Sequence, residues 1–261
     1  MKPTLGAVFL LLPVFCSAAE PHSGANPQCT STPCPKKVMQ TQNIGDCPDA
    51  GCTQTKGHTF DSQLDKLKNI RSDERKPDLQ SFEWIKGLPT PGATDYTLCG
   101  NRDALKQIGE GKKITVMAWA LKSETQGPES CNCDLAGIQN HDTHIGLVDP
   151  RLKHPTLETD KSGSVVAEFT PRVRLEDPKH PNFTTKVLNR TIRHNGNKLL
   201  VRVSGLLMFD TKHFFDKPKP TTRATYWEIH PILKFEYCED GITCRADSDQ
   251  NWKDLDNEPP A

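Results

Sequence analysis

The chain has 261 residues, and its 33 basic and 33 acidic side chains leave no net charge at pH 7. A neutral chain lacks the broad positive field on which non-specific nucleic-acid binding depends, so the composition carries no strong nucleic-acid signature. Beyond the N-terminus no stretch is long and apolar enough to predict a transmembrane segment. The length suits one large domain or two small ones.

Residues 1–19 are typical of a secretory signal peptide. Lys2 gives a positive start, residues 5–15 form an apolar core, and residues 17–19 are small, so we expect cleavage near Ala19. The mature protein is then expected to be secreted or periplasmic. Cys16 also allows a lipoprotein signal, which the bulky residue before it disfavours.

Of the ten cysteines, nine lie beyond this signal, and such a content is typical of an oxidising compartment. Because nine is odd, at least one cysteine must stay free or pair between chains. Two pairs, Cys29/Cys34 and Cys47/Cys52, share one spacing and predict two small-loop disulfides, with a four-thiolate zinc site as the alternative. The disulfide candidates are Cys29, Cys34, Cys47, Cys52, Cys99, Cys131, Cys133, Cys238 and Cys244.

We expect three regions to flank the central part of the chain, and the first of them cannot bury a core of its own. Residues 20–58 are rich in Pro, Gly and Cys and predict an arm. Residues 59–110 predict short helices that pack on the following domain, one beginning after Asp61 and another at 103–108. Residues 239–261 form an acidic tail, which we expect to be disordered.

Residues 111–238 predict a β domain. Strands are expected at 114–121, 143–148, 164–169, 199–209 and 222–237, with a helix at 184–193. Three strands, a helical or irregular connection and two more strands is the order of a five-stranded OB-like barrel, so the fold is expected to be mainly β. An open β-sandwich is the alternative. Gly205 is expected to mark a bend or bulge, and Pro231 an edge or a break.

Two strand segments each place an acid two residues before a histidine: Asp142 with His144, and Glu228 with His230. Residues i and i+2 of a strand point the same way, so all four side chains would meet if these strands are neighbours. Such a cluster suits a divalent metal and a metal-bound water, which points to a metal-dependent hydrolase, with nucleases among the candidates. The alternative is structural, with each acid fixing a histidine tautomer or the strand register. Further candidate ligands are His141 and Glu168.

An OB-like barrel also allows oligonucleotide or oligosaccharide binding on one face. The stretch from 172 to 202 is locally basic, although a solvated helix face is the alternative. The candidate nucleic-acid-binding residues are Arg172, Arg174, Lys186, Arg190 and Arg193. No nucleophile-elbow, phosphate-loop or zinc-protease motif is present in the sequence.

Four segments, 129–133, 141–148, 201–210 and 227–231, occur in an order that resembles a group of poorly characterised exported bacterial proteins. The most distinctive of them reads Trp-Glu-Ile-His-Pro. The likeness covers about residues 110–238, and it implies an OB-like barrel and an extracytoplasmic setting without an established activity. We therefore expect an exported binding or interaction module of unknown ligand, with the metal-dependent hydrolase as the first alternative.

Overall fold

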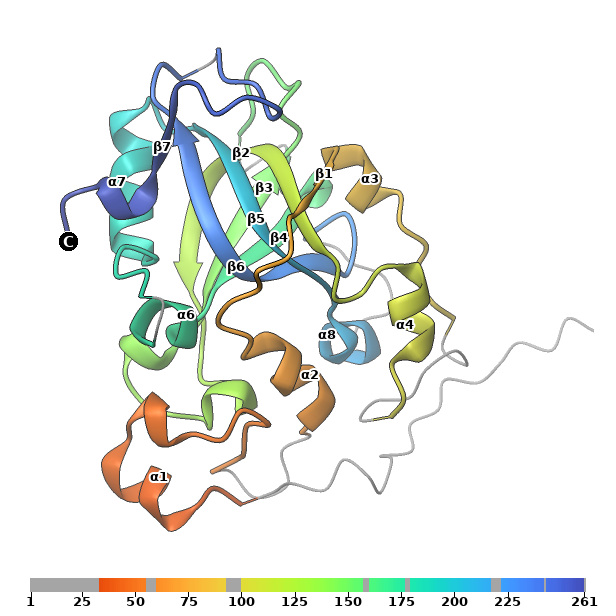
Figure 1. Ribbon diagram of the computed structural model, residues 1–261, viewed down its shortest axis with the longest axis vertical. Helices are drawn as coiled ribbons and strands as arrows, with labels where there is room; N and C mark the ends of the chain where they lie inside the picture. The colour runs from red at the N-terminus through yellow and green to blue at the C-terminus, as the bar shows by residue number, and fades with distance from the viewer. Residues whose placement is uncertain are drawn as a thin grey trace, which may run out of the picture.

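The computed structural model describes residues 33–54, 60–92, 100–156, 160–176, 179–216, 222–241 and 243–260. Figure 1 shows a strongly curved sheet with short helices around it. The expected signal peptide, Cys29 and Cys99 lie outside the described residues. Within the described residues, no helix combines the length and the apolar character needed to cross a membrane.

A closed five-stranded mixed β-barrel forms the centre of the fold. Its strands are β2 (Lys113–Thr125), β3 (Thr143–Val148), β4 (Val165–Phe169), β5 (Leu199–Phe209) and β6 (Trp227–Cys238). The order is β2-β3-β4-β6-β5, and β5 pairs again with β2, which closes the barrel. All these pairings are antiparallel except that of β4 with β6. The five expected strands are confirmed, and the closure replaces the alternative of an open sandwich.

Two short strands and several helices surround the barrel, so the content is mixed α/β where a mainly β chain was expected. Strand β1 (Asp78–Gln80) pairs with β2, and β7 (Trp252–Asp254) pairs with β6. The helices are α1 (Lys36–Thr41), α2 (Ser62–Lys68), α3 (Phe82–Lys86), α4 (Asp103–Ile108), α6 (Pro171–Leu175), α7 (Thr185–His194) and α8 (Thr211–Asp216). The 3-10 turns are η2 (Ile44–Asp46), η3 (Ser130–Asn132), η4 (Ile138–Asn140), η5 (Lys161–Gly163) and η6 (Leu255–Asn257).

The helices expected near Asp61 and at 103–108 are confirmed. The Asp61 carboxylate accepts hydrogen bonds from the main-chain N–H groups of Gln63 and Leu64, which fixes the start of α2. Helix α7 lies between β4 and β5, as expected, and its Val187, Leu188 and Ile192 are buried in the same apolar cluster as the barrel strands. The strand order and this connection are consistent with an OB-like barrel.

Strand β6 is irregular where it faces β5. Gly205 pairs with Ile232 and Leu207 pairs with Ile229, so two residues of β6 lie opposite one residue of β5. This is the bulge expected at Gly205, where a Cβ atom would lie 2.4 Å from the carbonyl oxygen of Pro231. The break expected at Pro231 is confirmed in the ladder, because the register of β6 against β5 shifts there, although strand β6 itself continues beyond this residue. A bulge tolerates proline, since its residues are left out of the ladder.

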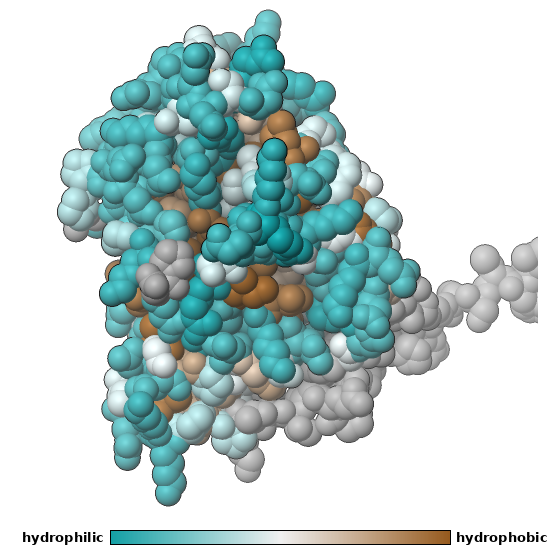
Figure 2. Space-filling model, viewed as in Figure 1, coloured by the Kyte–Doolittle hydropathy of each residue, from teal (hydrophilic) through white to brown (hydrophobic). Residues whose placement is uncertain are grey.

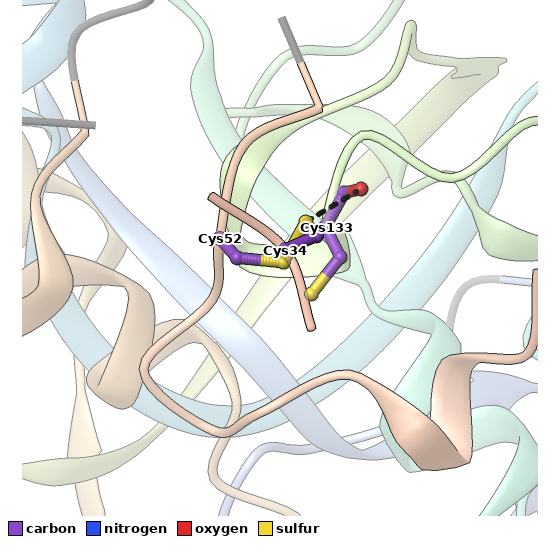
Figure 3. A group of neighbouring side chains, drawn as sticks. All are labelled: Cys34, Cys52 and Cys133. Atoms are coloured by element: carbon purple, nitrogen blue, oxygen red, sulfur yellow. Dashed lines mark hydrogen bonds between the residues drawn. A yellow bond between two sulfur atoms is a disulfide. The ribbon is translucent and has the colours of Figure 1, made fainter. Parts of the chain in front are cut away.

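Three disulfides are present among the described residues, and they indicate an oxidising compartment. They join Cys34 to Cys52, Cys47 to Cys133 and Cys238 to Cys244. Both expected small-loop pairs, Cys29/Cys34 and Cys47/Cys52, are therefore wrong, because Cys34 bonds to Cys52 and Cys47 bonds to Cys133. Figure 3 shows the Cys34–Cys52 bond beside Cys133, whose carbonyl oxygen lies 3.7 Å from the Cys34 sulfur. Of the described cysteines, Cys131 alone is free, and it is buried.

The acidic C-terminal segment packs on the barrel, so the expected disorder is wrong for residues 243–260. Strand β7 extends the sheet, and Asp256 pairs with His180 at 2.6 Å. The side-chain amide of Asn182 donates to the carbonyl oxygens of Leu255 and Glu258. Backbone pairing and these polar contacts order a segment whose composition alone favoured disorder.

Candidate metal centre

Ligand-type side chains form a row across three neighbouring strands. His144 of β3 lies directly opposite Glu168 of β4, and the next pair in register joins β4 to Ile229 of β6. Ile145, Ala167 and Ile229 alternate with the ligand-type residues along these strands, and all three belong to the apolar core. Because side chains alternate along a strand, the row and His230 lie on the face of the barrel wall opposite that core.

The structure brings the four sequence-predicted residues together and adds Glu168 at their centre. The Nε2 atom of His144 lies 2.6 Å from Glu168 Oε1, and the Nδ1 atom of His230 lies 3.3 Å from Glu168 Oε2. His230 Nδ1 also lies 3.4 Å from Glu228 Oε1. On the other side of the ring, His230 Nε2 lies 4.0 Å from Asp142 Oδ2.

His141, the remaining candidate ligand, does not join this cluster. Its Nε2 atom lies 3.1 Å from the carbonyl oxygen of Leu135. The extended residue His141 precedes β3, where the alternation from Asp142 to His144 sends its side chain the other way. It therefore makes a main-chain contact of the kind expected for a structural histidine.

A covering layer buries the cluster. It consists of Lys68 at the end of α2, Glu129 just before η3, and Cys131 within η3. Lys68 Nζ lies 2.8 Å from Glu129 Oε2. The side chains of Asp142 and His230 are fully buried, whereas that of His144 is 24% exposed.

The free thiol of Cys131 belongs to this layer. Its sulfur lies 3.7 Å from Glu129 Oε2 and 3.8 Å from Asp142 Oδ2. The sequence marked Cys131 only as a disulfide candidate, and it gave no reason to single out Glu129 or Lys68. Glu129 and Cys131 are two positions apart, but the segment carries no strand or helix periodicity that would place both in the cluster.

Several buried atoms at the centre have no hydrogen-bond partner. They are both ring nitrogens of His230, Glu168 Oε2 and Glu228 Oε1. Their neighbours lie close but in poor directions for a hydrogen bond. Buried polar atoms are almost always paired, and each exception costs about 1 to 3 kcal/mol. A bound ion would give a partner to those of these atoms that face it, since one side of the His230 ring faces Glu168 and Glu228 and the other faces Asp142.

The charges of the cluster shift each other strongly. Burial lowers the pKa of the His230 imidazole, but Glu168 and Glu228 outweigh burial and raise the pKa to about 10. Burial also opposes the rise for His144, where Glu168 dominates and raises the pKa to about 8. In return, both imidazoles hold the pKa of Glu168 well below its usual range despite its burial. Burial, reinforced by Glu129, raises the pKa of Asp142 to about 6.

Glu228 is held from behind by a second network. Arg223 donates to Glu228 Oε2 at 3.1 Å and to Asp210 Oδ2 at 2.6 Å. His213 Nδ1 lies 2.5 Å from the same Asp210 oxygen. These contacts fix one oxygen of Glu228 and leave the other, Oε1, facing His230. Such outer contacts orient the ligands of metal sites.

The residues fit a divalent transition metal. Asp142, Glu168 and His230 each offer one ligand atom, and these atoms lie within 4.8 Å of one another. One imidazole and two carboxylates suit zinc, manganese or iron. Glu228 and His144 lie next to this triad and can complete or orient it. A cavity of about 20 Å³, bordered by Lys68, Glu129 and Lys212, adjoins the covering layer. It holds about one water molecule.

The basic stretch is divided by the fold. Arg172 and Arg174 are buried, and their guanidinium groups donate to main-chain carbonyls, among them those of Cys47 and Phe183. Arg190 donates to the carbonyl of Pro260. The structure therefore keeps Lys186, Arg190 and Arg193 together on α7, where Arg190 is half-buried, and it separates them from the buried Arg172 and Arg174.

A surface groove of about 830 Å³ runs along β1, β5 and β6. Its walls interleave basic side chains, such as Arg202 and Lys234, with acidic ones, such as Glu236 and Asp249. Figure 2 shows that hydrophilic residues dominate the side of the molecule drawn there. Mixed charge of this kind provides no uniform track for a polyanion.

Comparisons of the chain with family models, with curated proteins and with solved structures found no match. The proposed function therefore rests on the fold and the side-chain geometry.

Proposed function

We propose that the chain is an exported metal-binding protein, in which an OB-like barrel holds one divalent transition-metal ion through Asp142, Glu168 and His230. The observation that carries this proposal is His230: its imidazole is fully buried, both ring nitrogens lack a hydrogen bond, and carboxylates lie on both sides. A structural histidine would bond a carbonyl, as His141 does.

The charge balance supports a cation at this position. Asp142, Glu168 and Glu228 are buried together, and the nearest arginine, Arg223, is shared between Glu228 and Asp210. Buried carboxylates need a compensating positive charge. Without an ion, that charge comes from Lys68 in the covering layer and from protonated imidazoles, in line with the raised pKa values of both histidines. A divalent ion supplies the charge and makes those protons unnecessary.

The same burial favours binding over the hydrolase alternative. A metal-dependent hydrolase needs an open coordination position that its substrate can reach. The side chains of Asp142, Glu228 and His230 are 0 to 1% exposed, and the covering layer lies over them. A polymer such as a nucleic acid would reach the ion only after that layer moved. Three disulfides support the exported setting, since such bonds persist outside reducing compartments.

Metal analysis tests the proposal. Protein treated with a chelator and then dialysed against Zn²⁺ or Mn²⁺ should retain at least one equivalent. Saturation should also raise the thermal midpoint, because an ion at a hundred times its dissociation constant stabilises by about 2.7 kcal/mol.

Two variants make the test specific. His230→Gln should lose an equivalent of metal and the thermal shift, whereas His194→Gln should keep both, because His194 is exposed on α7. Absence of stoichiometric metal and of any thermal shift in the unsubstituted protein would overturn the proposal. So would unchanged binding in the His230 variant.

A further inference from the structure

We propose that Glu129, Cys131 and Asp142 form a second cation position, which contains a thiolate and takes a thiophilic divalent ion such as Zn²⁺ or Cd²⁺. One carboxylate oxygen, one sulfur and one further carboxylate oxygen lie within 4.8 Å of one another here. The inference rests on the proposed function in one respect, because both positions use Asp142.

The hydrogen of the Cys131 thiol cannot serve both of the carboxylates that face it. Cys131 is buried, and its sulfur faces Glu129 Oε2 at 3.7 Å and Asp142 Oδ2 at 3.8 Å. A thiol has one hydrogen, so it can bond only one of these two acceptors. The other carboxylate then faces the sulfur without a proton between them. Glu129 Oε2 already accepts from Lys68 Nζ at 2.8 Å, so a metal ion between the three atoms would supply the missing partner of the sulfur and of Asp142 Oδ2.

The distances between the sulfur and the two carboxylate oxygens are close to those of a zinc site. In a tetrahedral zinc site, a sulfur at about 2.3 Å and an oxygen at about 2.0 Å from the ion lie about 3.5 Å apart. The two sulfur-to-oxygen distances of Cys131 exceed this by a few tenths of an ångström. A small inward shift of these side chains would therefore produce ligand spacing.

The two carboxylate oxygens of Asp142 have different surroundings. Oδ1 accepts a hydrogen bond from the side-chain amide of Asn132 at 3.1 Å. Oδ2 lies between His230 Nε2, at 4.0 Å, and the Cys131 sulfur. His230 Nε2 is fully buried without a hydrogen bond, and it points toward this shared oxygen. A carboxylate between two ligand sets is the usual bridge of two-metal sites, whose ions lie about 3.5 to 4 Å apart.

The ligand types separate the two positions. Imidazole and carboxylates at the first position admit manganese, iron or zinc, whereas thiolate at the second selects softer ions. The three ligands of the second position carry three negative charges, and Lys68, at 2.8 Å from Glu129, compensates one of them. The remaining two balance a divalent ion, so no further anion is needed.

Cobalt titration tests the inference, because a cobalt–thiolate bond produces a near-ultraviolet charge-transfer band that oxygen and nitrogen ligands do not. Oxidised, chelator-treated protein should bind two equivalents of Co²⁺ and develop the band. Cys131→Ser should bind one equivalent and show no band. As a control, His194→Gln, at an exposed position of α7, should leave both readings unchanged.

The other outcomes contradict the inference, and one of them also contradicts the proposed function. One equivalent without the band overturns the inference but leaves the proposed function standing. One equivalent with the band also overturns it, since Cys131 would then bind the single ion. No binding of Co²⁺ overturns the inference, and absence of Zn²⁺ and Mn²⁺ binding as well overturns both proposals. If Cys131→Ser does not fold, by circular dichroism, Glu129→Gln replaces it and should also lose one equivalent; retention of two equivalents in that variant overturns the inference.

Discussion

Glu168 is the acid on which both imidazoles of the cluster depend, and its replacement by glutamine gives the sharpest test of the network in the metal-free protein. Its side chain is 2% exposed and contacts His144 at 2.6 Å and His230 at 3.3 Å. Glutamine keeps the shape and removes the negative charge. Two buried imidazoles then lose their main electrostatic partner.

The size of the loss follows from the pKa of His230, which is raised to about 10 from an ordinary value of 6.5. One pKa unit corresponds to about 1.4 kcal/mol, so at pH 7 the protonated form contributes up to about 4 kcal/mol. Removal of one partner from a buried ion pair costs about 3 to 5 kcal/mol, which agrees. We expect Glu168→Gln to lower the free energy of unfolding by about 3 kcal/mol at pH 6 to 7.

The loss should also depend on pH in a definite direction. Histidines with raised pKa values stabilise the fold fully below about pH 6.5 and lose that effect as the pH rises through their folded values, about 8 for His144 and about 10 for His230. The metal-free protein should therefore lose stability between pH 6.5 and 10. In Glu168→Gln this slope should be much smaller.

Urea denaturation in the presence of a chelator at pH 6, 7.5 and 9 measures both effects. Glu236→Gln is a matched control, since Glu236 is a mostly buried carboxylate that pairs with Arg202 at 2.8 Å. An arginine stays protonated throughout, so this control should retain the pH slope of the unsubstituted protein. A loss below about 1 kcal/mol in Glu168→Gln, or a stability that rises from pH 7.5 to 9 in the unsubstituted protein, would refute the reasoning.

Three further predictions concern the framework of the site. Gly205→Ala should destabilise the fold by about 3 kcal/mol in urea denaturation, because the new Cβ would lie 2.4 Å from the Pro231 carbonyl oxygen; a change below about 1 kcal/mol would contradict this. Replacement of Cys47 and Cys133 by alanine should cost about 4 kcal/mol, since their bond closes a loop across 86 positions, and an unchanged denaturation midpoint would argue against it. Burial raises the pKa of Asp65 to about 8, so the folded state carries an extra proton between about pH 4 and 8 and stability falls with rising pH there. Asp65→Asn should therefore increase the midpoint at pH 7.5, and a decrease would show that the Asp65 charge is needed.

Strand periodicity made half of the candidate site predictable from the sequence. The spacing of Asp142 and His144, and of Glu228 and His230, fixes which side chains share a face. The sequence left open whether the second and fifth predicted strands lie near each other, and the structure places them on either side of the third. Glu168 appeared only as a further candidate, although the register puts it directly opposite His144. Register depends on turn geometry and bulges, which the sequence did not specify.

The covering layer was not predictable, because it depends on contacts between distant segments. Cys131, Glu129 and Lys68 meet over the barrel wall only after the arm and α2 have docked there. Cysteine pairing had the same difficulty, since equal spacing of Cys29/Cys34 and Cys47/Cys52 favoured local bonds. The observed partner of Cys47 lies 86 positions away, and nothing local specifies such a bond. Proline chemistry was informative at Pro231, where the ladder of β6 with β5 shifts register.

The Cys47–Cys133 bond ties the arm to the segment that carries Glu129 and Cys131. Formation of this disulfide would therefore precede ion binding. The barrel can assemble first, but the segment gains its covalent anchor only in an oxidising compartment. Protein made in a reducing host would then have an intact barrel, but its covering layer would lack the covalent anchor. Preparations from the two settings should be compared as distinct species before any metal content is assigned to this chain.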